Sequence, residues 1–165
     1  MNKFGIAFIL LLCSGCAYYK TPTTGPTALL ELRSNASTTI VRYFLDDQCT
    51  VDPDNPIGRL ALLYGDTLIR SAKNNMTRRV VAERDFVITF LSKSPSGAYT
   101  DQLCDVSSSF YPKDGATYSI KLDASYNNCR LEILRQVIAG GKISYQPEES
   151  QRNLERVCRY SRKND

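Results

Sequence analysis

The feature that most constrains the fold is a series of short stretches in which apolar and polar residues alternate. A period of two places successive side chains on opposite faces of a β-strand, so that one face is buried. β-Branched and aromatic residues, which favour strands, are common in these stretches, and turn signals separate them. We therefore expect about seven or eight strands. The stretches are 29–32, 39–45, 60–64, 78–82, 86–91, 118–122 and 129–133.

The clearest hairpin lies near the C-terminal end, where residues 118–122 and 129–133 alternate on either side of a turn at 124–128. Residues 137–146 are predicted to be either a linker or an edge strand, because Gly140-Gly141 interrupts them. Strands at this spacing, with no helix-length period between them, predict a mainly β fold: an antiparallel sandwich or a small barrel. A short C-terminal helix is expected only over 148–160, where Leu154, Val157 and Cys158 have helical spacing.

The segment 112–118, Pro-Lys-Asp-Gly-Ala-Thr-Tyr, resembles the tyrosine corner of immunoglobulin-like domains. The resemblance implies an immunoglobulin-like sandwich in which the Tyr118 hydroxyl makes a hydrogen bond to the preceding backbone. The alternative is a β-turn followed by a core tyrosine. Two immunoglobulin features are absent, because Ile120 stands where the cysteine is usual and the chain has no Trp.

The first sixteen residues have the order of an export signal. Lys3 precedes the apolar run 4–12, which is shorter than the roughly 20 residues that a bilayer-spanning helix needs. Ser14-Gly15 and then Cys16 follow, and this resembles the lipobox of bacterial lipoprotein precursors. The resemblance implies a diacylglyceryl group on the Cys16 thiol, cleavage before Cys16, and an N-acyl chain such as palmitate. An ordinary cleaved signal peptide is the alternative.

Domain boundaries and location follow from that resemblance. It implies a lipoprotein signal peptide over 1–15, a lipidated Thr/Pro/Gly-rich tether over 16–27, and a single β-rich domain with a helical tail over 28–165. Because Ala17 rather than Asp follows the cysteine, it also implies sorting to the outer membrane. The domain would then face the periplasm, held to the membrane by lipid.

Four cysteines remain after processing: Cys49, Cys104, Cys129 and Cys158. An even number in an exported chain predicts two disulfide bonds, for which three connectivities are possible. Of these we favour Cys49–Cys104 together with Cys129–Cys158.

Charge and composition exclude several classes of function. The chain has no His, which removes the usual general base, and the part expected to remain after processing has no CxxC pair of the kind that binds zinc. Without Lys3 the charge is 20 − 17 = +3, and no basic stripe of the nucleic-acid-binding kind is present. We expect no catalytic residue, no metal and no cofactor.

Three local groups of residues are candidate functional sites. Asp46, Asp47, Asp52 and Asp54 are candidates for calcium binding or acid–base chemistry, although turn formation is the simpler interpretation. The triplet 107–109, Ser-Ser-Ser, is interpreted as the polar edge of a strand. The stretch 96–99, Ser-Gly-Ala-Tyr, resembles a loop of periplasmic lysozyme inhibitors, but its Tyr comes one residue early.

The sequence therefore predicts a non-catalytic lipoprotein that binds another envelope protein or stabilises an envelope assembly. The alternative is a lipoprotein inhibitor of a lysozyme-like or other envelope-targeting enzyme. A glycosidase that uses carboxylates alone is a more distant alternative.

Overall fold

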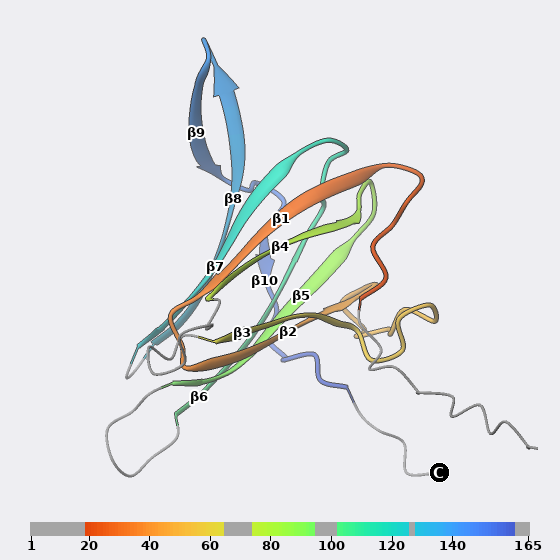
Figure 1. Ribbon diagram of the computed structural model, residues 1–165. Coiled ribbons are helices and arrows are strands. Elements are labelled where there is room, and N and C mark those ends of the chain that lie inside the picture. Colours follow the sequence, from red (N-terminus) through yellow and green to blue (C-terminus); the bar gives the residue numbers. More distant parts are fainter. Residues whose placement is uncertain (1–18, 65–73, 95–101, 126–127, 161–165) are drawn as a thin grey trace, which may run out of the picture.

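The computed structural model describes residues 19–64, 74–94, 102–125 and 128–160. These residues form two five-stranded sheets that pack face to face as a β-sandwich and do not close into a barrel (Figure 1). The strands are β1 (Thr27–Ser34), β2 (Thr38–Phe44), β3 (Arg59–Tyr64), β4 (Asn75–Val81), β5 (Phe86–Ser94), β6 (Gln102–Phe110), β7 (Thr117–Ser125), β8 (Asn128–Ala139), β9 (Lys142–Pro147) and β10 (Arg152–Asn153).

The strand order is β4-β1-β7-β8-β9 in the first sheet and β10-β6-β5-β2-β3 in the second. Neighbouring strands are antiparallel except β1 and β7, which are parallel. The predicted antiparallel sandwich is therefore confirmed. Among the described residues no helix is long and apolar enough to span a bilayer.

The core lies between the sheets and is built from the alternating positions of the strands. In β5, Phe86, Ile88 and Phe90 share the buried face, as the alternation predicts. A row of four aromatic rings crosses the core, with centroid separations of 5.5, 5.7 and 5.3 Å from one ring to the next. The rings are those of Tyr43, Phe86, Phe110 and Tyr118.

Tyr118 makes the contact that the tyrosine-corner resemblance implies. Its hydroxyl oxygen accepts a hydrogen bond from the backbone N–H of Lys113, five residues earlier, at 3.0 Å. The side chain is fully buried, and this burial raises the pKa of the Tyr118 hydroxyl. The hydrogen bond thus gives a buried polar group its partner while fixing the turn that precedes β7.

The predicted C-terminal helix is wrong. Residues 148–160 contain no helix: a turn at 149–150 leads into β10, which pairs with β6 opposite Ser108 and Ser109. Beyond β10, the backbone N–H of Leu154 donates to the Ser107 carbonyl at 3.0 Å. We call residues 152–158 the strap, because they run along the β6 edge of the second sheet and onto its outer face. Leu154 and Cys158 pack there against Phe44 and Val87, so these apolar residues are buried against a sheet rather than along a helix.

The segment 137–146 resolves to the edge-strand alternative. Gly140 and Gly141 have φ values of 57° and 76°, the positive pair that a two-residue hairpin turn requires, and they join β8 to β9. β8 pairs with β7 only as far as Arg135, so beyond that residue its described neighbour is β9 alone. The resulting two-stranded arm, residues 136–147, projects from the sandwich (Figure 1).

The N-terminal segment before β1 packs on the sandwich. The Tyr19 ring meets the Tyr43 ring edge-on with centroids 5.3 Å apart, and the Lys20 N–H donates to Asn55 Oδ1 at 3.0 Å. At its other end, the Pro26 carbonyl accepts a hydrogen bond from the N–H of Ala82. The described part of the predicted tether, 19–26, is therefore held against the domain rather than free of it.

Candidate functional site

Two of the predicted features lie outside the described residues. Cys16 falls in 1–18, and the stretch 96–99 that resembles a lysozyme-inhibitor loop falls in 95–101. The lipid anchor and the inhibitor loop therefore stay predictions.

All four mature cysteines form disulfide bonds, as predicted, but the favoured pairing is wrong. Cys49 pairs with Cys158, and Cys104 pairs with Cys129, with Cα atoms 5.3 and 5.6 Å apart. The second bond joins β6 of one sheet to the start of β8 in the other. The first ties the strap to the loop after β2. These bonds therefore fix the framework around the candidate site.

The four aspartates after β2 act in turns. Asp46 accepts the N–H of Thr50 at 3.0 Å, and this hydrogen bond holds the pKa of Asp46 below its usual range. Asp52 accepts the N–H of Asp54 at 2.9 Å and the Tyr43 hydroxyl at 2.7 Å. Burial, followed by this carboxylate, raises the pKa of Tyr43.

The observed aspartate contacts match the turn-forming interpretation. In the described ranges, no three His, Cys, Asp or Glu residues gather as a metal site would require.

The serine triplet of β6 is buried rather than at an open edge. The hydroxyls of Ser107 and Thr89 are 2.6 Å apart, and Ser107 Oγ also accepts the backbone N–H of Cys158 at 2.9 Å. Ser108 Oγ donates to the carbonyl of Arg152 in β10. The interpretation of a polar strand edge is therefore wrong, because the strap covers this strand. Ser107 and Ser108 therefore hold the strap against the sheet through hydrogen bonds.

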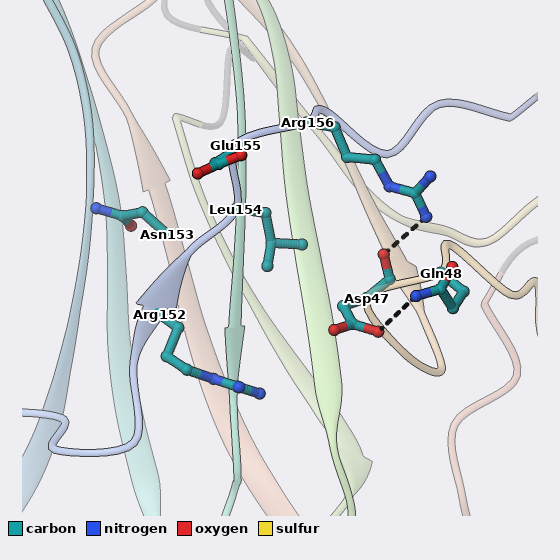
Figure 2. A pocket seen from close by; sticks show the side chains of 7 residues that line it. All are labelled: Asp47, Gln48, Arg152, Asn153, Leu154, Glu155 and Arg156. Carbon is teal, nitrogen blue, oxygen red and sulfur yellow. Dashed lines mark hydrogen bonds between the residues drawn. The ribbon is translucent and has the colours of Figure 1, made fainter.

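A polar hollow of about 470 Å³ lies between the strap and the loop after β2 (Figure 2). Arg152, Leu154 and Arg156 extend toward the loop side of the strap, while Asn153 and Glu155 point the other way. Arg156 closes one end by donating to the backbone carbonyl of Asp47 at 2.9 Å. The hollow thus presents guanidinium, carboxylate and amide groups, which suit hydrogen bonding to a polar peptide surface.

A second hollow of about 480 Å³ lies on the opposite side of the same strap, between it, β6 and the start of β8. The two hollows share Asn153, Leu154 and Glu155, so the strap forms a ridge between them. Arg159 forms an ion pair with Asp105 beside this second hollow. The ridge and its two hollows together form one polar, uneven surface along the strap.

A third hollow, of about 350 Å³, lies where the N-terminal segment crosses the sandwich. Tyr19, Tyr43 and Asn55 line it, and burial raises the pKa of Tyr19 to about 12. The Nε of Arg84, another lining residue, is buried without a hydrogen-bond partner. The aromatic and amide groups of this hollow, Tyr43 and Asn55, also contact the N-terminal segment. The hollow is therefore explained by the packing of that segment on the sandwich.

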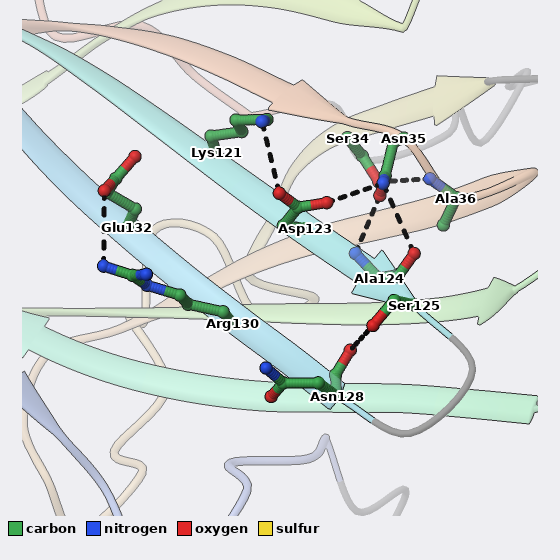
Figure 3. Close-up of polar contacts among 10 residues, drawn as sticks. All are labelled: Ser34, Asn35, Ala36, Lys121, Asp123, Ala124, Ser125, Asn128, Arg130 and Glu132. Atoms are coloured by element: carbon green, nitrogen blue, oxygen red, sulfur yellow. Dashed lines mark hydrogen bonds and ion pairs between the residues drawn. The ribbon is translucent and has the colours of Figure 1, made fainter.

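At the opposite end of the sandwich, Asn35 connects the β1–β2 turn to the end of β7 (Figure 3). Its side-chain amide donates to Asp123 at 2.8 Å and accepts the N–H of Ala124 at 2.7 Å. Asp123 also pairs with Lys121 at 3.3 Å. These contacts continue the β1–β7 pairing past the end of β1, so their role is structural.

The surface that sequence reasoning missed is the arm. Its Ile138, Ile143 and Tyr145 side chains are 68%, 62% and 44% exposed, although such residues are usually buried. The sequence carried part of the signal, because Ile143 and Tyr145 alternate with polar residues after the Gly140-Gly141 turn. Before the turn, residues 137–139 form an unbroken apolar run instead. An exposed apolar surface of this kind indicates a contact with another molecule.

Comparison with known proteins adds no family assignment: no protein-family model matches the chain, and no curated protein matches its sequence.

Proposed function

We propose that this chain is an outer-membrane-anchored lipoprotein and a non-catalytic binding or structural component of the cell envelope. The observation that carries the proposal is the order of the first sixteen residues: Lys3, the apolar run 4–12, Ser14-Gly15 and Cys16. Two disulfide bonds in the domain that follows support an exported protein, because such bonds persist in oxidising compartments.

The surface supports the binding role. The ridge of the strap offers charged and amide groups on both sides, and the arm offers apolar side chains beyond the sandwich. Burying such groups is how one protein surface recognises another. Of the aspartates that were candidates for acid–base chemistry, Asp46 and Asp52 are engaged with backbone N–H groups and the Tyr43 hydroxyl.

The anchor is tested by comparing Cys16→Ser with Cys13→Ser in the full chain. With Cys16→Ser we expect no incorporation of labelled palmitate, and the protein should no longer fractionate with the outer membrane. Cys13→Ser is the matched control, because Cys13 lies in the segment that processing removes; it should keep both label and fractionation. A Cys16→Ser protein that still carries label and stays in the outer membrane would refute the anchor.

The non-catalytic role is tested by cross-linking the full chain in intact envelopes and identifying its neighbours by mass spectrometry. Recovery of envelope structural proteins would support the proposal. A lysozyme-like hydrolase that is captured and loses activity with the purified chain would instead support the inhibitor alternative. Turnover of an envelope polymer by the purified chain would contradict both.

A further inference from the structure

The arm has two chemically different faces. Leu131 and Ile133 of β8 point into the core, so Leu134, Gln136 and Ile138 lie on the opposite side of that strand. Their partners in β9 lie on the same side. This face of the arm, which we call the apolar face, consists of Leu134, Gln136, Ile138, Ile143, Tyr145 and Pro147. The other face consists of Arg135, Val137, Ala139, Lys142, Ser144 and Gln146.

The β9 edge of the arm is protected against strand pairing, whereas its apolar face is not. Lys142 opens β9 and Pro147 ends it. Charged side chains and proline are features by which edge strands avoid pairing with another strand, because proline has no N–H to donate. Contact through the apolar face is therefore favoured over contact through the β9 edge.

The arm also needs support that the described residues do not give it. A two-stranded hairpin is at best marginally stable in water, and beyond Arg135 the described neighbour of β8 is β9 alone. Ile138 and Ile143, which stand opposite each other, remain more than half exposed. Covering the apolar face would remove this surface from water and hold the two strands together.

We propose that the apolar face is covered by the same face of a second copy of this chain. The apolar faces of the two arms stack on each other with the arms running in opposite directions. The two-fold axis that relates them lies at the Gln136–Tyr145 pair, the middle pair of the face. Ile138 and Ile143, near the tip of each arm, then lie over Leu134 and Pro147 at the base of the other. The sandwiches lie at opposite ends of the paired arms and do not collide.

Two properties of the face favour a second copy over an unrelated partner. It carries no charged side chain, so two identical faces meet without like-charge repulsion. Its single amide side chain, Gln136, stands at the middle of the face, where the two-fold axis places it next to Gln136 of the second copy. Each amide can donate to and accept from the other, so neither is buried without a partner.

A lipid bilayer is a less suitable occupant. In Figure 1 the arm points upward, away from the red N-terminal segment that would lead to the lipid anchor. If the chain is anchored as proposed above, an arm that points away from the described start of the chain meets a neighbouring protein more readily than the membrane.

The interface is small, so the association is weak in dilute solution. Six residues of strand extend about 20 Å and two strands are about 10 Å wide, well below the ~800 Å² per partner of a stable complex. Anchoring both copies in one membrane would raise their local concentration. The test must therefore capture the contact covalently.

The full chain carrying Gln136→Cys is expressed as two differently tagged copies, purified in detergent and treated with a short bismaleimide. We expect a covalent dimer that carries both tags. Ser144→Cys is the matched control, because Ser144 is exposed on the other face of the same arm; it should give several-fold less dimer. Adding Ile138→Asp to the Gln136→Cys chain should abolish the product without lowering the melting temperature, because Ile138 lies outside the core.

Three results would overturn the proposal: equal cross-linking of Gln136→Cys and Ser144→Cys, a product that contains a protein other than this chain, or binding of the wild-type chain to phosphatidylethanolamine–phosphatidylglycerol vesicles that Ile138→Asp eliminates. The Cys16→Ser background separates the two proposals. There the dimer should still form at matched protein concentration, even though the anchor is lost.

Discussion

The two halves of β8 both carry apolar side chains, but these side chains have opposite environments. In the first half, Leu131 and Ile133 are 6% and 0% exposed, because the second sheet covers them. In the second half, Ile138 is 68% exposed. The comparison teaches that alternation identifies which face of a strand is apolar but not what covers that face.

The halves also differ in how their edges are held. The side chain of Gln151 acts in place of a strand beside the first half: its Nε2 donates to the Leu131 carbonyl, and its Oε1 accepts the N–H of Ile133. The start of this half is also tied to β6 through Cys129. The far half has β9 as its described support.

The largest expected effect comes from truncating one isoleucine in each half. Ile133→Ala should lower the free energy of unfolding by about 2–5 kcal/mol, because it leaves a cavity in the core. Ile138→Ala should change it by less than about 0.5 kcal/mol, because the side chain is exposed in the monomer. Urea denaturation at low protein concentration measures both. Equal losses of unfolding free energy for the two substitutions would contradict the division of β8 into a buried half and an exposed half.

Removing the disulfide bond at the start of β8 should have the next largest effect. Cys104→Ala with Cys129→Ala is expected to cost about 3 kcal/mol, since the bond closes a loop of roughly 25 residues in the unfolded chain. Amide hydrogen exchange in residues 142–147 should not change with it, because the arm opens independently of the sandwich. Faster exchange in the arm would show that the two halves are coupled.

Gln151→Ala should cost about 1–3 kcal/mol, because it leaves two backbone groups of β8 without their partner. Gln146→Ala is the matched control in the arm, where the side chain is exposed and makes no such contact with the described strands. It should leave the thermal midpoint unchanged. A comparable loss for the two substitutions would show that the arm contributes to global stability.

The smallest effects compare two turn glycines. Gly115 and Gly141 have φ values of 67° and 76°, and no atom lies within 4 Å of where a Cβ would stand at either. Alanine therefore adds the same backbone strain, about 1–2 kcal/mol, at each. For Gly115→Ala this strain should lower global stability. For Gly141→Ala it should appear only as faster hydrogen exchange in the arm.

Much of the fold could be predicted from the sequence because strands bury alternate residues. Tyr118, Ile120 and Leu122, with Leu131 and Ile133, form the predicted hairpin and all lie in the core. The tyrosine-corner contact could also be predicted, because it depends on residues only five positions apart. Local spacing sufficed wherever the partner was nearby in sequence or on the same face.

The C-terminal segment was mispredicted because its spacing is ambiguous. Leu154, Val157 and Cys158 fit one face of a helix, but the strap sends them to different sides: Leu154 and Cys158 pack against the second sheet, and Val157 lines the second hollow. What holds the strap is distant in sequence: Ser107 accepts the Cys158 N–H, and Cys49 bonds to its sulfur. The disulfide pairing failed for the same reason, since it depends on which strands become neighbours. The candidate binding surface was missed because exposure, unlike periodicity, is a property of the whole fold.

The bond between Cys49 and Cys158 sets an order of events in the making of the protein. Phe44 and Val87 are covered by residues near the end of the chain. Until residue 158 has been synthesised, the Cys49 thiol has no partner and these side chains stay open to solvent. A nascent chain therefore carries a reactive thiol beside an apolar patch while the 109 residues from Cys49 to Cys158 are made, a state prone to mispairing or aggregation. Truncation before Cys158 would make that transient state permanent.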